Sequence, residues 1–575
     1  MNGFFLSALV DFPDDCVDVV YTPESIDAMV AKLKEMGVKR LYWQNYGDIR
    51  HGGFWEKGEP RFITNYKTLQ IMNDPNKVAI DAAHRHGLEF CMVMKPYEHG
   101  VSMSYPEGSQ KAKEIGKLPC IGGMLGCVDT FVQEHPEMRI ARRKDDIPDG
   151  LDQTPVTRIE LYKYDDSPTR IKKENIEIWV SELNVDYKKL DIEFGFTDEI
   201  APAYCDFRGF MGEYLAEKNA PVRKLTLSGL HLLDKYIIVT TNFTEPAGEN
   251  SGDFKNSAVD IIRAFGPDGN EIPLCYGRDY NYWTYYPPVE GRGCFEYGVG
   301  FDDAFGNLTV TLDEPKTNWR QGFVAITRGR NAYLPAALCE SYPEVREHWL
   351  SMIKDALDAG ADMIDFRIEN HSSHTDDPFA YGYNDVVLDE YKKRYGDAPV
   401  DVVRIAEIRG EYYSQFLRDA RKLVLSYGKK MHHHLNVDYF REDPPYQRRM
   451  AYPWNMRIEW EKWLDEGLLD EAHIRSHTTT TKFILNDPFS LRVIDMCKKR
   501  GVPMNINRYI FEGGLYNTTI ESYEEDYNLI RAKGCFQSFV VYEVASLMTS
   551  DEKEGIVVKM PEMCETISKM HADYC

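Results

Sequence analysis

The chain has 575 residues, of which 43% are hydrophobic and 28% charged, a composition typical of globular proteins that excludes a disordered chain. A single core is not expected at this length, so the sequence predicts one large domain with one or two smaller ones. The formal net charge of −24 repels phosphate backbones and anionic membrane surfaces, which argues against nucleic acid as a partner.

Before residue 156, short apolar strands alternate with amphipathic helices, a pattern that predicts parallel βα units. The helix expected over 22–37 illustrates it, because Thr22 suits the cap, Pro23 falls in the first turn and Gly37 ends the helix. Three strands are expected in this part of the chain, over residues 4–12, 40–46 and 88–97.

Between residues 156 and 329 the helical period disappears, and β-rich stretches are separated by Gly, Pro, Asn and Asp turns. Closely spaced strands of this kind predict an antiparallel β-sandwich inserted into the larger domain. We expect this insert to extend a substrate cleft, to mediate homo-oligomer assembly, or to be a rigid appendage.

From residue 330 the alternation of helix and strand resumes, with strands expected over 362–369, 430–438, 470–477, 503–510 and 538–545. Three strands before the insert and five after it predict an α/β fold, a (β/α)8 TIM barrel with an antiparallel β-sandwich domain inserted after strand 3. The expected domains are residues 1–155 and 330–575 for the two parts of the barrel and 156–329 for the insert.

The chain begins without a basic leader, and no segment has the uninterrupted apolar length of a membrane helix. Its twelve cysteines include no CxxC pair, so neither a zinc knuckle nor a dithiol redox motif is indicated. We therefore expect a cytoplasmic protein with free thiols, no membrane partner and no cofactor.

The stretch DMIDFRIENHSSH, residues 362–374, carries a charge at every second position of an apolar strand, at Asp365, Arg367 and Glu369. Alternate residues of a barrel strand face the interior, so this row is expected inside, with Glu369 nearest the C-terminal mouth. Later strands repeat the pattern, and their expected inward residues are His432, His434, Asn436, Asp438, His473, Arg475, His477, Asn505, Asn507 and Glu543. We expect supporting roles for the deep members and chemical roles at the strand C-termini, where the active sites of this fold lie.

Loops after the second and third strands add candidates for substrate binding. Asn45 and Lys95 offer polar groups there, and Glu98 offers a carboxylate. Trp43 is expected either to stack on a sugar ring or to belong to the aromatic core.

The segment FRIENHSSH resembles the alpha-amylase superfamily, in which an Arg two residues before the strand-four carboxylate orients the nucleophile. Asp362, Asp365 and Glu369 also match the spacing of the chitinase D-x-x-D-x-D-x-E motif, but Arg367 replaces the Asp that handles the N-acetyl group, which argues against chitinase chemistry. Longer stretches are similar to glycosyl-hydrolase-like barrel proteins related to family ten, over residues 135–143, 342–367, 460–476 and 539–545. This similarity covers the barrel and not the insert, and it implies a glycosidase-type fold.

Glycoside cleavage needs two carboxylates, one protonated to assist the leaving group and one ionised as nucleophile or base. Glu369 is the first candidate, and a nearby Arg367 favours its ionised form. Glu543 is the preferred partner, with Glu512, Asp438 and Glu98 as alternatives. The residues expected to bind a small carbohydrate substrate are Arg367, His434, Asn436, Asp438, Arg475, His477, Asn507, Lys95, Asn45 and Trp43.

Two other hypotheses fit the same barrel. In a metal-dependent hydrolase or lyase, His432, His434, His473 and His477 would supply imidazole ligands, with Asp438 or Glu369 as the oxygen ligand. The His-x-His pair lies on strand five, however, whereas metal-dependent amidohydrolase barrels carry theirs on strand one. A non-catalytic carbohydrate-binding protein is favoured by the lack of a glutamate on strand seven.

Overall fold

The computed structural model describes residues 4–12, 15–16, 19–44, 63–99, 129–145, 150–182, 187–208, 214–243, 261–272, 274–278, 323–328, 332–369, 378–437, 440, 455–475, 481–511, 518–551 and 553–572. Within these ranges, no helix combines the length and the apolar character that crossing a membrane requires.

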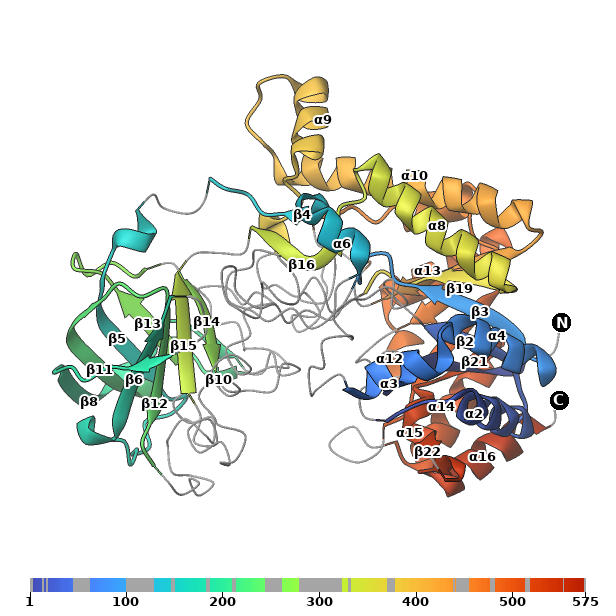
Figure 1. Cartoon of the computed structure of the whole chain (residues 1–575), viewed down its shortest axis with the longest axis horizontal. Helices are drawn as coiled ribbons and strands as arrows, with labels where there is room; N and C mark the ends of the chain where they lie inside the picture. The colour runs from blue at the N-terminus through green and yellow to red at the C-terminus, as the bar shows by residue number, and fades with distance from the viewer. Residues whose placement is uncertain are drawn as a thin grey trace.

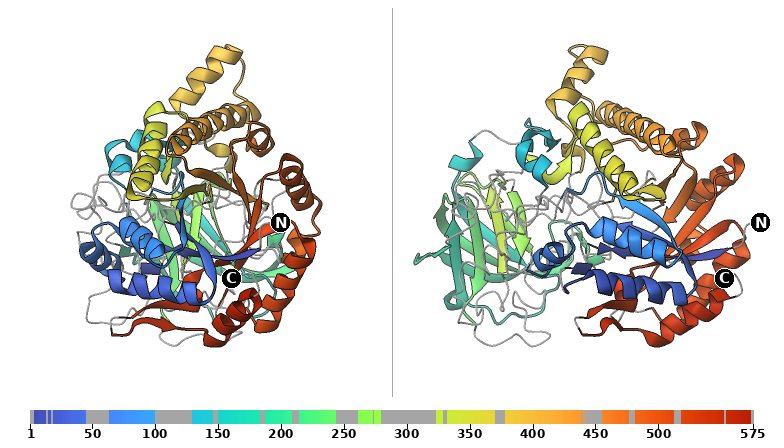
Figure 2. Two further views of the ribbon diagram at one scale, coloured as in Figure 1. Left: turned by 90° about the vertical axis from the view of Figure 1, so that its right-hand side faces the viewer. Right: turned by 45° about the vertical axis from the view of Figure 1, so that its right-hand side comes forward.

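Eight parallel strands close into a barrel, in which each strand pairs with the next barrel strand along the chain and the last pairs with the first. The strands are β1 (Phe5–Asp11), β2 (Val38–Gln44), β3 (Glu89–Met94), β17 (Met363–Phe366), β18 (Lys430–Asn436), β19 (Glu471–Arg475), β20 (Met504–Tyr509) and β21 (Phe536–Tyr542). Helices surround these strands (Figure 1, Figure 2), an arrangement consistent with a TIM barrel. The predicted eight-stranded barrel is confirmed, with strand ends that differ by a few residues.

Several helices around the barrel are amphipathic and bury one apolar stripe in the core. In α2 (Pro23–Glu35), Thr22 and Ser25 form a capping box, as the sequence predicted for the cap, and Ile26 and Val30 face the core. The other helices are α3 (Ile63–Met72), α4 (Pro75–Arg85), α6 (Thr130–Glu134), α8 (Pro343–Ala359), α9 (Asp385–Tyr395), α10 (Val402–Ser426), α11 (Trp460–Asp465), α12 (Thr481–Ile484), α13 (Pro488–Arg500), α14 (Ile520–Lys533), α15 (Val544–Leu547) and α16 (Pro561–His571).

Strand β17 has one apolar face and one polar face, as the row of charged residues predicted. Ile364 and Phe366 pack into the main apolar cluster that lies between the strands and the helices. In the neighbouring β18, His433 also faces outward, because its Nε2 lies 3.0 Å from the Tyr413 hydroxyl of α10. The intervening positions therefore point into the barrel, where their polar groups gather. β17 itself ends at Phe366, earlier than predicted, so Glu369 lies just beyond it.

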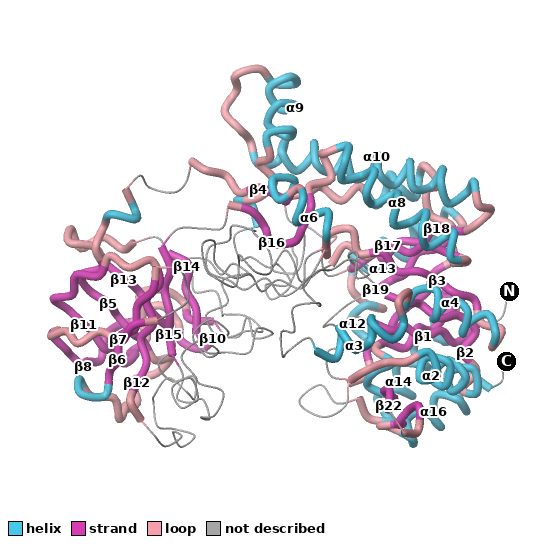
Figure 3. The backbone as a smooth tube through the Cα atoms, viewed as in Figure 1, coloured by secondary structure: helices cyan, strands magenta, loops and turns pink. Residues whose placement is uncertain are grey.

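Two antiparallel sheets form from the chain between β3 and β17. The four-stranded sheet has the order β13 (Ile261–Phe265), β5 (Val156–Tyr162), β11 (Pro221–Leu232), β8 (Gly195–Pro202). The five-stranded sheet has the order β14 (Leu274–Arg278), β15 (Phe323–Arg328), β12 (Tyr236–Thr241), β6 (Ile176–Ser181), β7 (Lys188–Lys189). Figure 3 shows these strands apart from the barrel, and both sheets contribute side chains to one apolar cluster. An inserted sandwich domain bounded at 156 and 329 stays a prediction.

Three short strand pairs complete the described sheets. β4 (Arg139–Ala141) pairs with β16 (Tyr333–Leu338), so the segments that leave and rejoin the barrel lie side by side. The other pairs are β9 (Phe207–Arg208) with β10 (Tyr214–Ala216), and β22 (Met548–Asp551) with β23 (Gly555–Val558).

Gly410, in the middle of α10, allows a close backbone contact. A Cβ atom at this position would lie 2.2 Å from the carbonyl oxygen of Arg457, far inside van der Waals contact. Alanine normally stabilises a helix relative to glycine by about 1 kcal/mol. We expect Gly410→Ala to lower the midpoint of thermal unfolding instead, because the Arg457 backbone must move away. A raised midpoint in calorimetry would contradict the close contact.

Candidate active site at the barrel mouth

Six barrel strands end in a polar or aromatic side chain at the C-terminal edge, and two further polar residues follow β17. We call these eight residues the mouth cluster: Asp11, Gln44, Arg367, Glu369, Asn436, Arg475, Tyr509 and Tyr542. All of them are at most 8% exposed. The cluster lies at the end of the barrel where this fold carries its active sites.

Glu369 is held by groups that favour its ionised form. The Asn436 amide donates a hydrogen bond to Oε1, and Arg475 Nε lies 3.3 Å from the same oxygen. Arg367 Nε lies 4.0 Å from Oε2, which makes no hydrogen bond with any described residue. Burial opposes ionisation, but Arg475, Arg367 and Asn436 outweigh it and keep the pKa of Glu369 below its usual range. The site therefore contains a buried carboxylate with one oxygen fixed and the other available.

Arg367 connects Glu369 to a second carboxylate, Asp11. Its Nη1 donates to Gln44 Oε1 at 2.6 Å and lies 3.6 Å from Asp11 Oδ2. The Gln44 amide and the Tyr542 hydroxyl both donate to Asp11 Oδ2, the latter at 3.1 Å. Arg367 is thereby fixed between two carboxylates, and Asp11 serves to position it.

Arg475 is fixed by two tyrosines on the other side of Glu369. Its Nη2 donates to the Tyr509 hydroxyl at 2.9 Å, and its guanidinium carbon lies 4.9 Å from the centre of the Tyr542 ring. Burial raises the pKa of Tyr509 to about 12, against the opposing effect of Arg475, and the charge of Glu543 contributes to the increase. The charge of Glu543 also raises the pKa of Tyr542, after burial. Both phenols are therefore neutral, and Glu543 acts on them electrostatically from the position directly after β21.

The structure brings together part of the predicted site. Arg367, Glu369, Asn436 and Arg475 lie in the mouth cluster, whereas Glu543, at the N-terminus of α15, is half-buried next to it. Asn507 is 5% exposed, and its side-chain amide has no hydrogen-bond partner among the described residues. The predicted Asn45, Asp438 and His477, and the alternative Glu512, lie outside the described residues.

Three predicted residues lie elsewhere. Trp43 is fully buried on the outer side of β2, where it stacks on Phe12 and donates to Asn76, so the prediction that it stacks on a sugar is wrong. Lys95 forms an ion pair with Glu98, and both side chains are completely buried. His434 contacts Asp365 below the mouth cluster.

Sequence reasoning missed four members of the mouth cluster. Asp11 and Gln44 are the last inward residues of β1 and β2, strands whose other inward side chains include Leu9 and Tyr42. A row of charges did not mark these strands. Their signal was a single polar residue at the C-terminal end of an apolar strand, and Tyr509 and Tyr542 offered only an aromatic residue at the same position.

A second layer of polar residues lies beneath the mouth cluster. His434 Nε2 is 2.8 Å and His473 Nδ1 is 3.4 Å from Asp365 Oδ2, and all three side chains are fully buried. Burial lowers the pKa of both histidines well below the usual range, and neighbouring cationic groups lower it further. Burial raises the pKa of Asp365, to which the charges of Glu471 and Glu369 add. Asp365 thus pairs with imidazoles and not with Arg367.

The deepest polar layer is a structural ion pair with saturated hydrogen bonding. Arg40 Nη1 lies 2.6 Å from Glu471 Oε2, which also accepts hydrogen bonds from Asn505 at 3.0 Å and Gln537 at 2.6 Å. His432 Nε2 lies 3.6 Å from the other carboxylate oxygen. Asn505 thus hydrogen-bonds to this ion pair, whereas neither ring nitrogen of His432 has a hydrogen-bond partner among the described residues.

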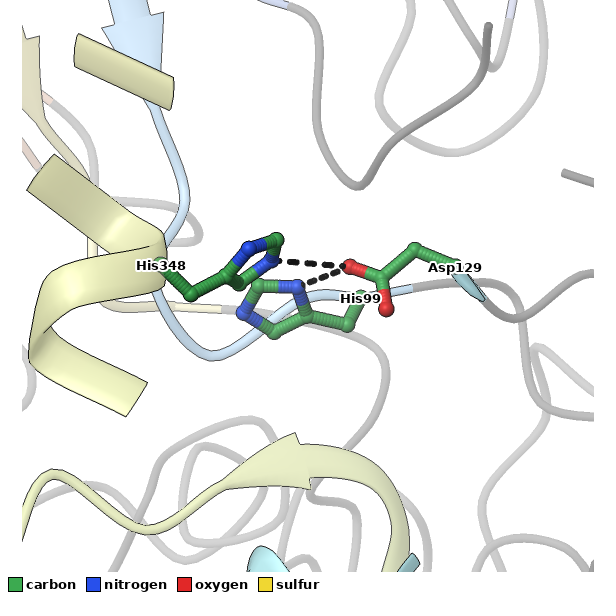
Figure 4. Close-up of side chains that lie close together, drawn as sticks. All are labelled: His99, Asp129 and His348. Carbon is green, nitrogen blue, oxygen red and sulfur yellow. Dashed lines mark hydrogen bonds and ion pairs between the residues drawn. The ribbon is translucent and has the colours of Figure 1, made fainter. Parts of the chain in front are cut away.

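A separate group of two histidines and an aspartate lies behind the end of β3. Figure 4 shows His99 and His348 pointing at Asp129, with His99 Nδ1 at 2.5 Å and His348 Nε2 at 3.5 Å from Oδ2. At its other ring nitrogen, His99 Nε2 lies 2.8 Å from both the Trp349 indole nitrogen and the Pro96 carbonyl oxygen. Asp129 Oδ1 accepts the Val132 N–H and caps α6. This group joins α6 and α8 to β3 through hydrogen bonds.

No protein-family model matches the chain. No curated protein sequence matches it either.

Several solved structures resemble the chain at low identity. The catalytic domain of β-amylase from Paenibacillus polymyxa is 8% identical, with 99% of each chain covered and a TM-score of 0.34. The β-galactosidase from the psychrophilic Marinomonas ef1 is 7% identical, covering 98% of this chain and 59% of the other, with a TM-score of 0.35. The galactosidase domain of an alpha-galactosidase–sucrose kinase is 8% identical, covering 100% of this chain and 41% of the other, with a TM-score of 0.33. Similarity this low carries no information about the reaction, which depends on the side chains at the barrel mouth.

Proposed function

We propose that the protein is a glycoside hydrolase that cleaves an oligosaccharide or glycoside at the barrel mouth. The observation that carries this proposal is the state of Glu369, a buried carboxylate whose Oε1 is fixed by Asn436 and Arg475 while Oε2 has no hydrogen-bond partner among the described residues. An ionised carboxylate with one available oxygen is what a glycosidase needs as nucleophile or base.

Glu543 is the proton donor in this proposal. It is half-buried, follows the last barrel strand, and is close enough to raise the pKa of Tyr509 and Tyr542, the tyrosines that contact Arg475. Arg475 and Arg367 keep Glu369 ionised, and the amide of Asn507 is available for a substrate hydroxyl. The two carboxyl groups would then act on opposite sides of the glycosidic bond.

A panel of aryl glycosides and oligosaccharides tests the proposal. We expect release of the aryl group or of reducing sugar from at least one member, and proton NMR of the first-formed anomer then assigns retention or inversion. Binding of a member of the panel without turnover, under conditions that span the pH range, would favour the non-catalytic carbohydrate-binding protein instead.

The pH profile should depend on Arg475. Glu369 acts when ionised, and the guanidinium favours this form, so removing the positive charge raises the pKa of Glu369. In Arg475→Gln we expect the acidic limb of kcat/KM to move upward by about 1 pH unit or more. Arg508→Gln is the matched control, because Arg508 lies on β20 but pairs with Asp526 of α14. An equal shift in both variants would exclude a direct effect on Glu369.

The sheets between β3 and β17 form, in our proposal, an inserted sandwich domain over residues 156–329 that extends the substrate cleft or mediates homo-oligomer assembly. Light scattering of the full chain distinguishes an oligomer from a monomer. We further propose a cytoplasmic location, supported by the unpaired thiols of Cys91, Cys339, Cys497, Cys535 and Cys564, which fit a reducing compartment.

A further inference from the structure

We propose that Asp365, His434 and His473 form a binding site for a divalent transition-metal ion, Zn²⁺ by preference, within the barrel and beneath the mouth cluster. The three residues come from β17, β18 and β19, which are adjacent, and each is 0% exposed. The site is independent of the glycosidase proposal, since it rests on different residues.

The separations of the three side chains are close to those of metal ligands. Metal–ligand bonds of about 2.0–2.2 Å place neighbouring ligand atoms about 3 to 3.5 Å apart. His434 Nε2 and His473 Nδ1 lie 2.8 and 3.4 Å from Asp365 Oδ2, and the three candidate ligand atoms all lie within 4.8 Å of one another. Two imidazoles and a carboxylate on rigid strands are a donor set that suits zinc and its first-row neighbours.

His434 provides an independent observation. Its Nε2 is 2.8 Å from Asp365 Oδ2, yet the geometry is not that of a hydrogen bond, and neither ring nitrogen has a hydrogen-bond partner among the described residues. Buried polar atoms in native proteins are nearly always satisfied, and an ion is one explanation for an exception. His434 is therefore a fully buried imidazole that lies beside a buried carboxylate without a hydrogen bond to it.

The charges inside the barrel favour a cation in the same place. The described interior contains the guanidiniums of three residues, Arg40, Arg367 and Arg475, and the carboxylates of four, Asp11, Asp365, Glu369 and Glu471. Glu471 pairs with Arg40, whereas Asp11 and Glu369 contact Arg367 and Arg475. Asp365 is the carboxylate without a guanidinium partner among these contacts, so a bound cation compensates its charge. A buried carboxylate otherwise requires a proton.

The group formed by His99, Asp129 and His348 differs from this site. Both ring nitrogens of His99 already have protein partners, Nδ1 with Asp129 and Nε2 with Trp349 and Pro96. His348 also lies 14% exposed on α8, at the side of the barrel. It therefore provides a matched control.

Metal content of the full-length protein tests the proposal. The protein is stripped with a chelator, dialysed against Zn²⁺ or Co²⁺, and analysed by mass spectrometry of the metal and by visible absorption of the Co²⁺ form. We expect one tightly bound ion per chain, retained in His348→Gln and lost in His434→Gln and His473→Gln. Absence of binding by the wild type, or loss in His348→Gln with retention in His434→Gln, would overturn the site.

Spectroscopy of the wild-type protein tests the metal site even when a barrel variant fails to fold. X-ray absorption of the Zn²⁺ form should show a nitrogen and oxygen shell with the multiple scattering of two imidazoles. Sulfur ligands or a shell without imidazole would overturn the proposal. No substrate enters these measurements, so their outcome is separate from that of the glycosidase assays.

Discussion

Glu369→Gln should lower kcat by about 10²- to 10⁴-fold on any glycoside that the wild type cleaves, the range expected when a positioned ionisable group is removed. The substitution keeps the size of the side chain and an oxygen that accepts from Asn436, but removes the negative charge between Arg367 and Arg475. Initial rates at saturating substrate measure the effect, and KM should change much less. Full turnover by this variant would remove Glu369 from the chemistry.

Glu89→Gln is the control for a lost carboxylate in the same barrel. Glu89 begins β3 at the opposite end of the barrel, where its side chain is 52% exposed and pairs with Arg40. We expect its kcat to stay close to that of the wild type.

Rescue of activity by small anions distinguishes a chemical role of Glu369 from a structural one. In Glu369→Ala the missing carboxylate leaves space for azide or formate, which should restore part of the turnover because the anion takes over the attack. A variant that is inactive through misfolding does not recover in this way. Recovery with azide and a glycosyl azide product would identify Glu369 as a nucleophile, whereas loss of activity without any recovery would favour a supporting role.

The barrel was predictable from the sequence because its later strands alternate charged and apolar residues. Arg367 and Glu369 lie inside because Phe366 and its apolar neighbours pack on the helices. The same reasoning missed β2, whose inner face holds Arg40, Tyr42 and Gln44, because only the first of these is charged. Trp43 and Gln44 point in opposite directions, and a shift of one residue exchanges the two faces of a strand.

The contacts within the site were less predictable than its location. The two-residue period of a strand predicts which side chains point into the barrel. It does not predict how deep in the barrel each of them lies, because the depth depends on the register between strands. His434 lies opposite His473, and Asn436 opposite Arg475. This register places His434 beside Asp365 and Asn436 beside Glu369. The register between strands cannot be derived from a single sequence, so these contacts could not be predicted.

Loss of the buried ion pair between Glu340 and Arg409 should have the largest effect on stability. Arg409, on α10, donates to both carboxylate oxygens of Glu340 at 2.6 and 2.9 Å, and the Tyr97 hydroxyl donates to Oε2 at 3.1 Å. Both side chains are 0% exposed, so the partner of a removed group remains as an uncompensated buried charge. We expect Glu340→Ala to lower the free energy of unfolding by about 3–5 kcal/mol.

Arg418 and Glu466 provide a pair of the same geometry in a different environment. Arg418 also lies on α10 and donates to both oxygens of Glu466 at 2.7 and 2.9 Å, but the two side chains are 29% and 32% exposed. Water solvates either charge once its partner is gone, so Glu466→Ala should cost about 1 kcal/mol or less. Urea unfolding measures the free energy of unfolding of both variants, taken from the transition in which the barrel unfolds. Equal losses would mean that burial does not set the strength of these pairs, since their hydrogen-bond geometry is the same.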